Sequence, residues 1–238
     1  MIGSRSRPDR EDWLVRIPAR FKDGKEGFDL RLAHDLGAVG VKAYTLSPLA
    51  DRSVKESLPE AIPVFVDWLE HLDERIPDGR TLQEQLHKRA IWIGLMNNLY
   101  DPAAKGSQQV VAVLLNQFDK PNFHIEGHFP ATRTLAYVAT AKDFDRMVAL
   151  FDKASDHDCA RLPLVHYVGR FNTERSRGLL LSFITNDAEL RWEAICALPR
   201  MKHREDIEMI EQYRGTTDVA GDKIIDAAVR KLRRVADG

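Results

Sequence analysis

Two short runs of the sequence hold residue types that can do chemistry. The first is His124-x-Glu126-x-His128, in which imidazole and carboxylate groups could bind zinc or non-haem iron. The run departs from the helical H-E-x-x-H pattern, which places a base directly after the first histidine. Gly127 and Pro130 indicate a loop here. We therefore interpret the run as a polar turn, with a metal site as the lesser alternative.

The second run, Asp156-His157-Asp158-Cys159, brings together an acid, an imidazole and a thiol, as nucleophilic catalysis requires. Side chains that are adjacent in sequence point in different directions on a helix, so such neighbours rarely form a catalytic set. A solvated turn between helices is the simpler interpretation. The sequence also lacks a nucleophile elbow, a phosphate-binding glycine loop and a dinucleotide fingerprint. We predict no catalytic residue, no cofactor and no resident metal.

Aromatic and basic residues offer a different chemistry, the binding of another macromolecule. Trp68 and Trp92 lie in or beside apolar stripes, which predicts core packing. Trp192 is less clearly apolar in its surroundings and follows Arg191 directly. Arg161 and Arg191 occupy one repeat position, where an arginine can either hold helical layers together or face a partner. The candidate binding residues are Trp192, Arg161, Arg191 and His166.

Two basic clusters end helical stretches, where cations interact favourably with the helix dipole. We interpret both as solvated faces and helix caps, with phosphate binding as the minor alternative. The first cluster is Arg200, Lys202, His203 and Arg204, and the second is Arg230, Lys231, Arg233 and Arg234.

Composition limits the class of protein. The 238 residues include 44% hydrophobic and 30% charged residues, and 36 acids nearly cancel 35 bases. The global positive field of a general nucleic-acid binder is therefore missing. Neither an apolar stretch of membrane-spanning length nor a secretory signal is evident, which predicts a cytoplasmic protein. Cys159 and Cys196 are predicted to be reduced thiols in the core.

The spacing of apolar residues predicts helices in the first half of the chain. Gly40 should end the first helix, and the stretch 59–73 carries an apolar stripe behind two early prolines. Thr81 and Glu84 are spaced as a capping box for a buried helix. Ser107 should begin another; its run to Phe118 is β-branched, but the sequence offers no comparable strand with which it could pair.

The second half repeats itself with a period near 31 residues. Arg161, Val165, Val168 and Arg170 match Arg191, Ile195, Leu198 and Arg200 at an offset of 30, and Leu198 and Arg200 match Val229 and Lys231 at 31. Leu135 stands 63 residues before Leu198. Each unit predicts a short helix, a turn and a second apolar helix, as in 174–184, 185–187 and 189–201. Such pairs bury both apolar faces only when stacked.

The stretch Asp187-Ala-Glu-Leu-Arg-Trp-Glu-Ala-Ile-Cys-Ala-Leu198 resembles the second helix of HEAT repeats. A weaker likeness extends over residues 26–235. The resemblance implies that Asp187 and Arg191 are scaffold residues that support adjacent repeats. Pro199 departs from the pattern and should kink or end its helix.

These observations predict an all-α protein, a right-handed HEAT-like superhelix of about five to six helical pairs. Residues 1–25 would form a flexible or docking segment, and 26–238 a single repeat domain. The expected function is a non-enzymatic protein-binding module, such as a scaffold, adaptor or immunity-type inhibitor. The alternatives are a HEAT-like DNA-binding protein or DNA glycosylase and, less favoured, a metal-dependent enzyme using His124 and His128.

Overall fold

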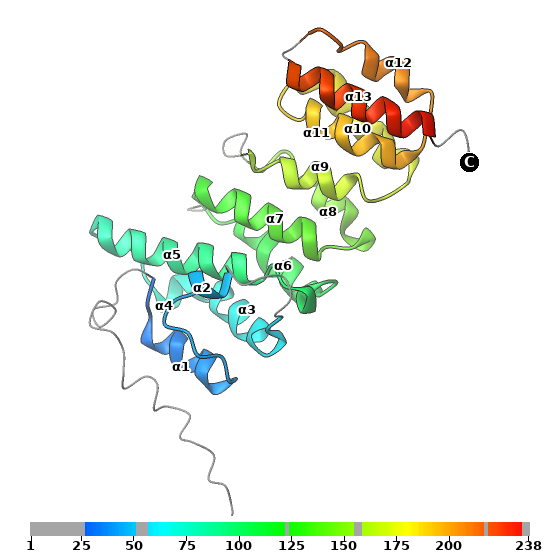
Figure 1. The fold of residues 1–238 in the computed structure, drawn as a ribbon. Coiled ribbons are helices and arrows are strands. Elements are labelled where there is room, and N and C mark those ends of the chain that lie inside the picture. Colours follow the sequence, from blue (N-terminus) through cyan, green and yellow to red (C-terminus); the bar gives the residue numbers. More distant parts are fainter. Residues whose placement is uncertain (1–26, 51–56, 122–123, 155–158, 217–218, 235–238) are drawn as a thin grey trace, which may run out of the picture. The chain divides into compact units, whose positions relative to one another are not determined.

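The described part of the chain is entirely helical. The computed structural model describes residues 27–50, 57–121, 124–154, 159–216 and 219–234, and these contain thirteen α-helices and no strand (Figure 1). The chain forms two compact units that divide between Ala139 and Thr140. No helix in the described ranges is long and apolar enough to cross a membrane. The predicted segment 1–25 and the turn at 156–158 lie outside the described residues, and the single repeat domain over 26–238 stays a prediction.

Unit 1 is built around α3, which contacts α1, α5 and α6, while α7 covers α5 and α6. Phe65 and Leu69 of α3 are fully buried, and Trp68 is 1% exposed, with its indole N–H donating to Asp35 at 2.8 Å. Trp92 is also buried and donates to Gln117. The predicted core role of both tryptophans is confirmed. The helices are α1 (Leu30–Ala38), α2 (Ser47–Ala50), α3 (Ile62–Glu70), α4 (Leu72–Arg75), α5 (Leu82–Asn98), α6 (Gln108–Gln117) and α7 (His128–Val138).

Several sequence signals in unit 1 act as predicted. Thr81 and Glu84 form the capping box of α5, and the Ser107 hydroxyl accepts from the Val110 N–H at the start of α6. The β-branched run after Ser107 is helical because tertiary packing overrides its propensity. Gly40, with φ of +89°, follows the end of α1.

One prediction for unit 1 is wrong. The helix after Thr81 is buried only in its second half, because its first two turns extend into solvent and leave Leu82 71% exposed. The run from His124 to His128 contains a turn, as predicted: a 3₁₀ turn, Ile125–Gly127, leads directly into α7, which begins at His128. Pro130 is accommodated in the first turn of that helix, where no N–H is needed.

Unit 2 alternates first and second helices of the repeat. The second helices α9, α11 and α13 lie in sequence, with α9 against α11 and α11 against α13, while α10 contacts α9 and α11 (Figure 1). Pro199 ends α11 as predicted, because the chain continues as a 3₁₀ turn, Leu198–Met201. The helices are α8 (Phe144–Ala149), α9 (Leu162–Val168), α10 (Glu174–Asn186), α11 (Arg191–Ala197), α12 (Asp206–Glu211) and α13 (Val219–Arg234).

The repeat offsets of 30 and 31 also align the burial of the second helices. Three sets of equivalent positions are buried in all three repeats and two sets are exposed in all three, whereas Asp226 is exposed although the equivalent Val165 and Ile195 are buried. The buried sets are Leu164, Ala194 and Ile225; Tyr167, Ala197 and Ala228; and Val168, Leu198 and Val229. The exposed sets are His166, Cys196 and Ala227, and Arg170, Arg200 and Lys231.

Candidate functional site

Arg161 and Arg191 are held inside unit 2. The Arg161 guanidinium contacts the Asp187 carboxylate at 2.6 Å, which links the start of α9 to the end of α10. The Arg191 Nε donates to the carbonyl of Ile184 at 2.7 Å, and its guanidinium lies 4.6 Å from the ring centre of Tyr213. These contacts support the scaffold interpretation of both arginines and leave their part in binding a prediction.

Trp192 and His166, by contrast, lie on the solvent side of the second helices. Trp192 is half-buried and stands one helical turn before Cys196 on α11. His166 is exposed on α9, and its Nε2 lies 2.8 Å from the Glu193 carboxylate of α11. The structure thus separates the four predicted binding residues into two arginines with contacts inside unit 2 and two residues on the solvent side of the second helices.

This surface carries a row of cations, which we call the basic face and define as Arg170, Arg200 and Lys231 with His166, Trp192 and Cys196 beside them. Arg170 and Arg200 come just after the last α-helical turns of α9 and α11, and Lys231 lies within α13. All three cations are exposed. Their equivalence in the repeat places one cation on each of three successive helices.

Aromatic contacts hold Arg170 in place. The Arg170 guanidinium packs 4.8 Å from the ring centre of Tyr167 and 5.6 Å from that of Phe171. Partial burial lowers the pKa of Arg170, Tyr167 raises it, and the like charge of Arg200 lowers it. These contacts fix one guanidinium of the basic face against the rings.

The carboxylates within α9, α11 and α13 contact groups outside the row of cations. These helices contain three acids, of which Glu193 contacts His166. Asp222 accepts from the Gly215 N–H at 2.9 Å, and Asp226 contacts Arg214 at 2.9 Å, so both are engaged by the segment between α12 and α13. The side chains of Arg200 and Lys231 make no ion pair or hydrogen bond with the described part of the chain.

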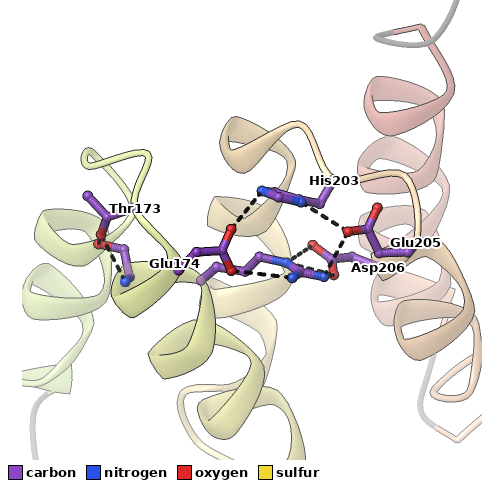
Figure 2. A network of polar contacts seen from close by, with 7 residues as sticks. Thr173, Glu174, His203, Glu205 and Asp206 are labelled. Carbon is purple, nitrogen blue, oxygen red and sulfur yellow. Dashed lines mark hydrogen bonds and ion pairs between the residues drawn. The ribbon is translucent and has the colours of Figure 1, made fainter.

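Three acids of unit 2 gather between α10 and α12. Figure 2 shows Glu174, Glu205 and Asp206 around a central guanidinium, that of Arg177, while His203 bridges Glu174 and Glu205. Arg177 contacts Asp206 at 2.6 Å, and the Asp206 side chain is 2% exposed. The carboxylates of this network tie α10 to α12.

The predicted burial of the two cysteines is wrong, because both are exposed. Cys159 lies before α9 with a left-handed φ of 57°. Cys196 occupies the solvent-facing repeat position of His166. Partial burial and Glu193 raise the pKa of the Cys196 thiol, whereas Lys231 lowers it. The net increase keeps this thiol protonated at neutral pH and makes it a poor nucleophile.

Unit 1 contains a cleft of about 710 Å³, lined by Trp92, Leu82 and Leu86 together with Lys88 and Lys120. Its two lysines are already neutralised within the cleft wall. Lys88 contacts Asp73 and Asp78 at 2.8 and 2.6 Å, and Lys120 contacts Asp73 at 2.8 Å. Both lysines of the cleft are therefore paired with carboxylates, whereas the Arg200 and Lys231 side chains of the basic face make no ion pair with the described residues.

The histidine run beside the cleft distributes its side chains to different partners. Glu126 contacts Arg89 at 2.7 Å, His124 Nδ1 accepts from the Glu126 N–H, and His128 packs against the ring of Phe118. No group of three or more His, Cys, Asp or Glu side chains in the described ranges is placed to hold a metal ion.

Comparison of the chain with protein-family models, curated proteins and solved structures gives no match.

Proposed function

We propose that this protein is a non-enzymatic protein-binding module that uses the basic face of unit 2 to bind an acidic surface of another protein. A scaffold, an adaptor and an immunity-type inhibitor each bind another protein through such a surface. We also propose that the fold is HEAT-like. The resemblance then implies stacked helical pairs whose second helices line an extended binding surface.

One observation carries the proposal: Arg170, Arg200 and Lys231 stand at equivalent repeat positions on adjoining helices and are all exposed. The Arg200 and Lys231 side chains make no ion pair with the described residues, so both are available to the carboxylates of a partner. An acidic partner forms charge-assisted hydrogen bonds with these cations.

The number and surroundings of these cations favour a protein over a nucleic acid. A DNA-binding protein commonly neutralises about six to ten phosphates, whereas the row supplies three cations in a chain of net charge −1. A DNA glycosylase of the HEAT-like kind also requires a carboxylate beside an exposed tryptophan. The nearest carboxylate in sequence, Glu193, is held by His166.

The test captures partners from the native host with the immobilised full-length chain. The double variant Arg200→Glu/Lys231→Glu reverses two charges on the basic face. Arg204→Glu is the matched control, because Arg204 is an exposed cation of unit 2 that lies at the start of the α12 segment. Circular dichroism verifies that each variant is folded.

We expect the double variant to lose partners that the wild type and Arg204→Glu both retain. Capture that is equal for all three proteins contradicts the proposal. Loss of capture after nuclease treatment identifies nucleic acid as the ligand and also contradicts it.

A further inference from the structure

On the basis of the proposed function, we infer that the partner contributes an extended segment in the polyproline II conformation with a carboxylate at every third residue. This segment crosses α9, α11 and α13 along Arg170, Arg200 and Lys231.

The direction of the row follows from the contacts between second helices. His166 of α9 contacts Glu193 of α11, and three residues later a Cβ on Gly169 would lie 2.7 Å from the Cβ of Ala197. The contact partners thus move toward the C-terminus on both helices, from 166 and 193 to 169 and 197, so α9 and α11 run parallel and side by side. Equivalent positions consequently form a row that crosses the helix axes.

The α13 end of the row is close to α11 as well. The helix α13, which carries Lys231, packs on α11. Packed helices lie about 8–10 Å apart. The backbone positions that carry successive cations of the basic face are therefore spaced by about one interhelix distance.

This spacing selects among the regular conformations of a peptide. A polyproline II helix has three residues per turn and rises about 3.1 Å per residue, so every third side chain lies on one side at intervals of about 9.3 Å. In a β-strand, residues three apart point to opposite sides. A seven-residue polyproline II segment with acids at its first, fourth and seventh positions thus meets all three cations at once.

The surroundings of the cations also suit this conformation. Proline-rich segments bind to surfaces that present aromatic rings. The Arg170 guanidinium is held against Tyr167 and Phe171, and Trp192 lies half-buried near the start of α11, one turn before Cys196. A preformed polyproline II segment also loses little conformational entropy on binding.

The experiment measures fluorescence anisotropy of labelled peptides at low ionic strength with the full-length chain. The periodic peptide is (Glu-Pro-Pro)₄. A block peptide has the same composition but consecutive glutamates. A helical peptide carries glutamates seven residues apart, which a helix also places on one side, about 10.5 Å apart. A ten-residue oligothymidylate represents single-stranded DNA, and the proteins are the wild type, Arg200→Glu and Arg204→Glu.

We expect the periodic peptide to bind at least about fivefold more tightly than the block peptide, with the difference lost in Arg200→Glu and retained in Arg204→Glu. Equal binding of the two peptides overturns the spacing inference but leaves the proposed function intact if capture still depends on the basic face. Tighter binding of the helical peptide overturns the inferred conformation. Salt-dependent binding of the oligonucleotide without peptide binding overturns both proposals.

Discussion

Gly169 is the position where the stacking of α9 on α11 can be tested most sharply. It follows α9 with φ of −65° and ψ of −4°, a conformation that alanine adopts readily. On backbone grounds alone, Gly169→Ala should stabilise the protein by about 0.4–1 kcal/mol, because alanine restricts the unfolded chain. The structure predicts the opposite sign. The new Cβ would lie 2.7 Å from the Cβ of Ala197, closer than packed carbon atoms approach.

Relieving this clash requires the ends of two packed helices to separate. Overpacking of this kind costs about 1–3 kcal/mol, and about 1 kcal/mol shifts the melting temperature of a chain of this size by roughly 2–4 °C. Gly178→Ala is the matched control. Gly178 lies exposed within α10 with nothing near its added Cβ, so this substitution should stabilise by about 0.5–1 kcal/mol.

The assay is urea-induced unfolding followed by circular dichroism, applied to a double-mutant cycle with Ala197→Gly. Ala197→Gly alone should cost about 1 kcal/mol through lost helix propensity. The double variant lacks the clash, so its destabilisation should be smaller than the sum of the single effects by about 1–3 kcal/mol. The stacking of α9 against α11 would be refuted if Gly169→Ala stabilised the protein, or if the effect of the double variant equalled the sum of the two single effects.

Two further predictions concern polar contacts that hold single helices in place. The Glu84 carboxylate accepts from the backbone N–H groups of Arg80 and Thr81, and these hydrogen bonds lower its pKa. This contribution to stability is present above pH of about 4.5 and is lost as the pH falls through the lowered pKa. Glu84→Gln should therefore melt below wild type at pH 7, with the difference narrowing under acid; a gap unchanged at pH 3 would contradict this. Arg177→Met should lower the free energy of unfolding by about 3–5 kcal/mol, because the Asp206 carboxylate, 2% exposed, would stay buried without its partner. Urea unfolding of the Arg177→Met variant measures this change. A decrease in the free energy of unfolding below about 1 kcal/mol would contradict the prediction, because it would show that water reaches Asp206 when Arg177 is removed.

Local signals in the sequence predicted helix boundaries well. Thr81 with Glu84, Ser107 and Pro199 each act through backbone groups within a few residues, so their effect depends little on the rest of the fold. The repeat offsets were equally informative, because apolar residues at equivalent positions must face the same core. The burial of Leu164, Ala194 and Ile225 follows that pattern.

Features set by tertiary packing could not be predicted in this way. Cys196 has apolar sequence neighbours, but the phase of α11 turns it to solvent, which the repeat alignment with His166 could have indicated. Arg161 and Arg191 are aligned in sequence yet make different contacts, because Asp187 and the carbonyl of Ile184 reach them from α10.

The basic face was present in the sequence only in part. Arg170, Arg200 and Lys231 already align at the repeat offsets, but Arg200 and Lys231 were assigned to helix ends on their local surroundings. The structure adds that all three positions are exposed and that the acids of α13 contact the segment after α12 instead. Neither fact can be obtained without the helix phases and the packing of α12 against α13.

The most direct test of the basic face as a binding surface is a titration of the ¹⁵N-labelled chain with (Glu-Pro-Pro)₄, followed by amide chemical shifts. We predict that the largest shifts fall on residues 166–170, 196–200 and 227–231, and that Arg200→Glu abolishes them. Shifts that concentrate on α10, α12 or unit 1 would contradict this account.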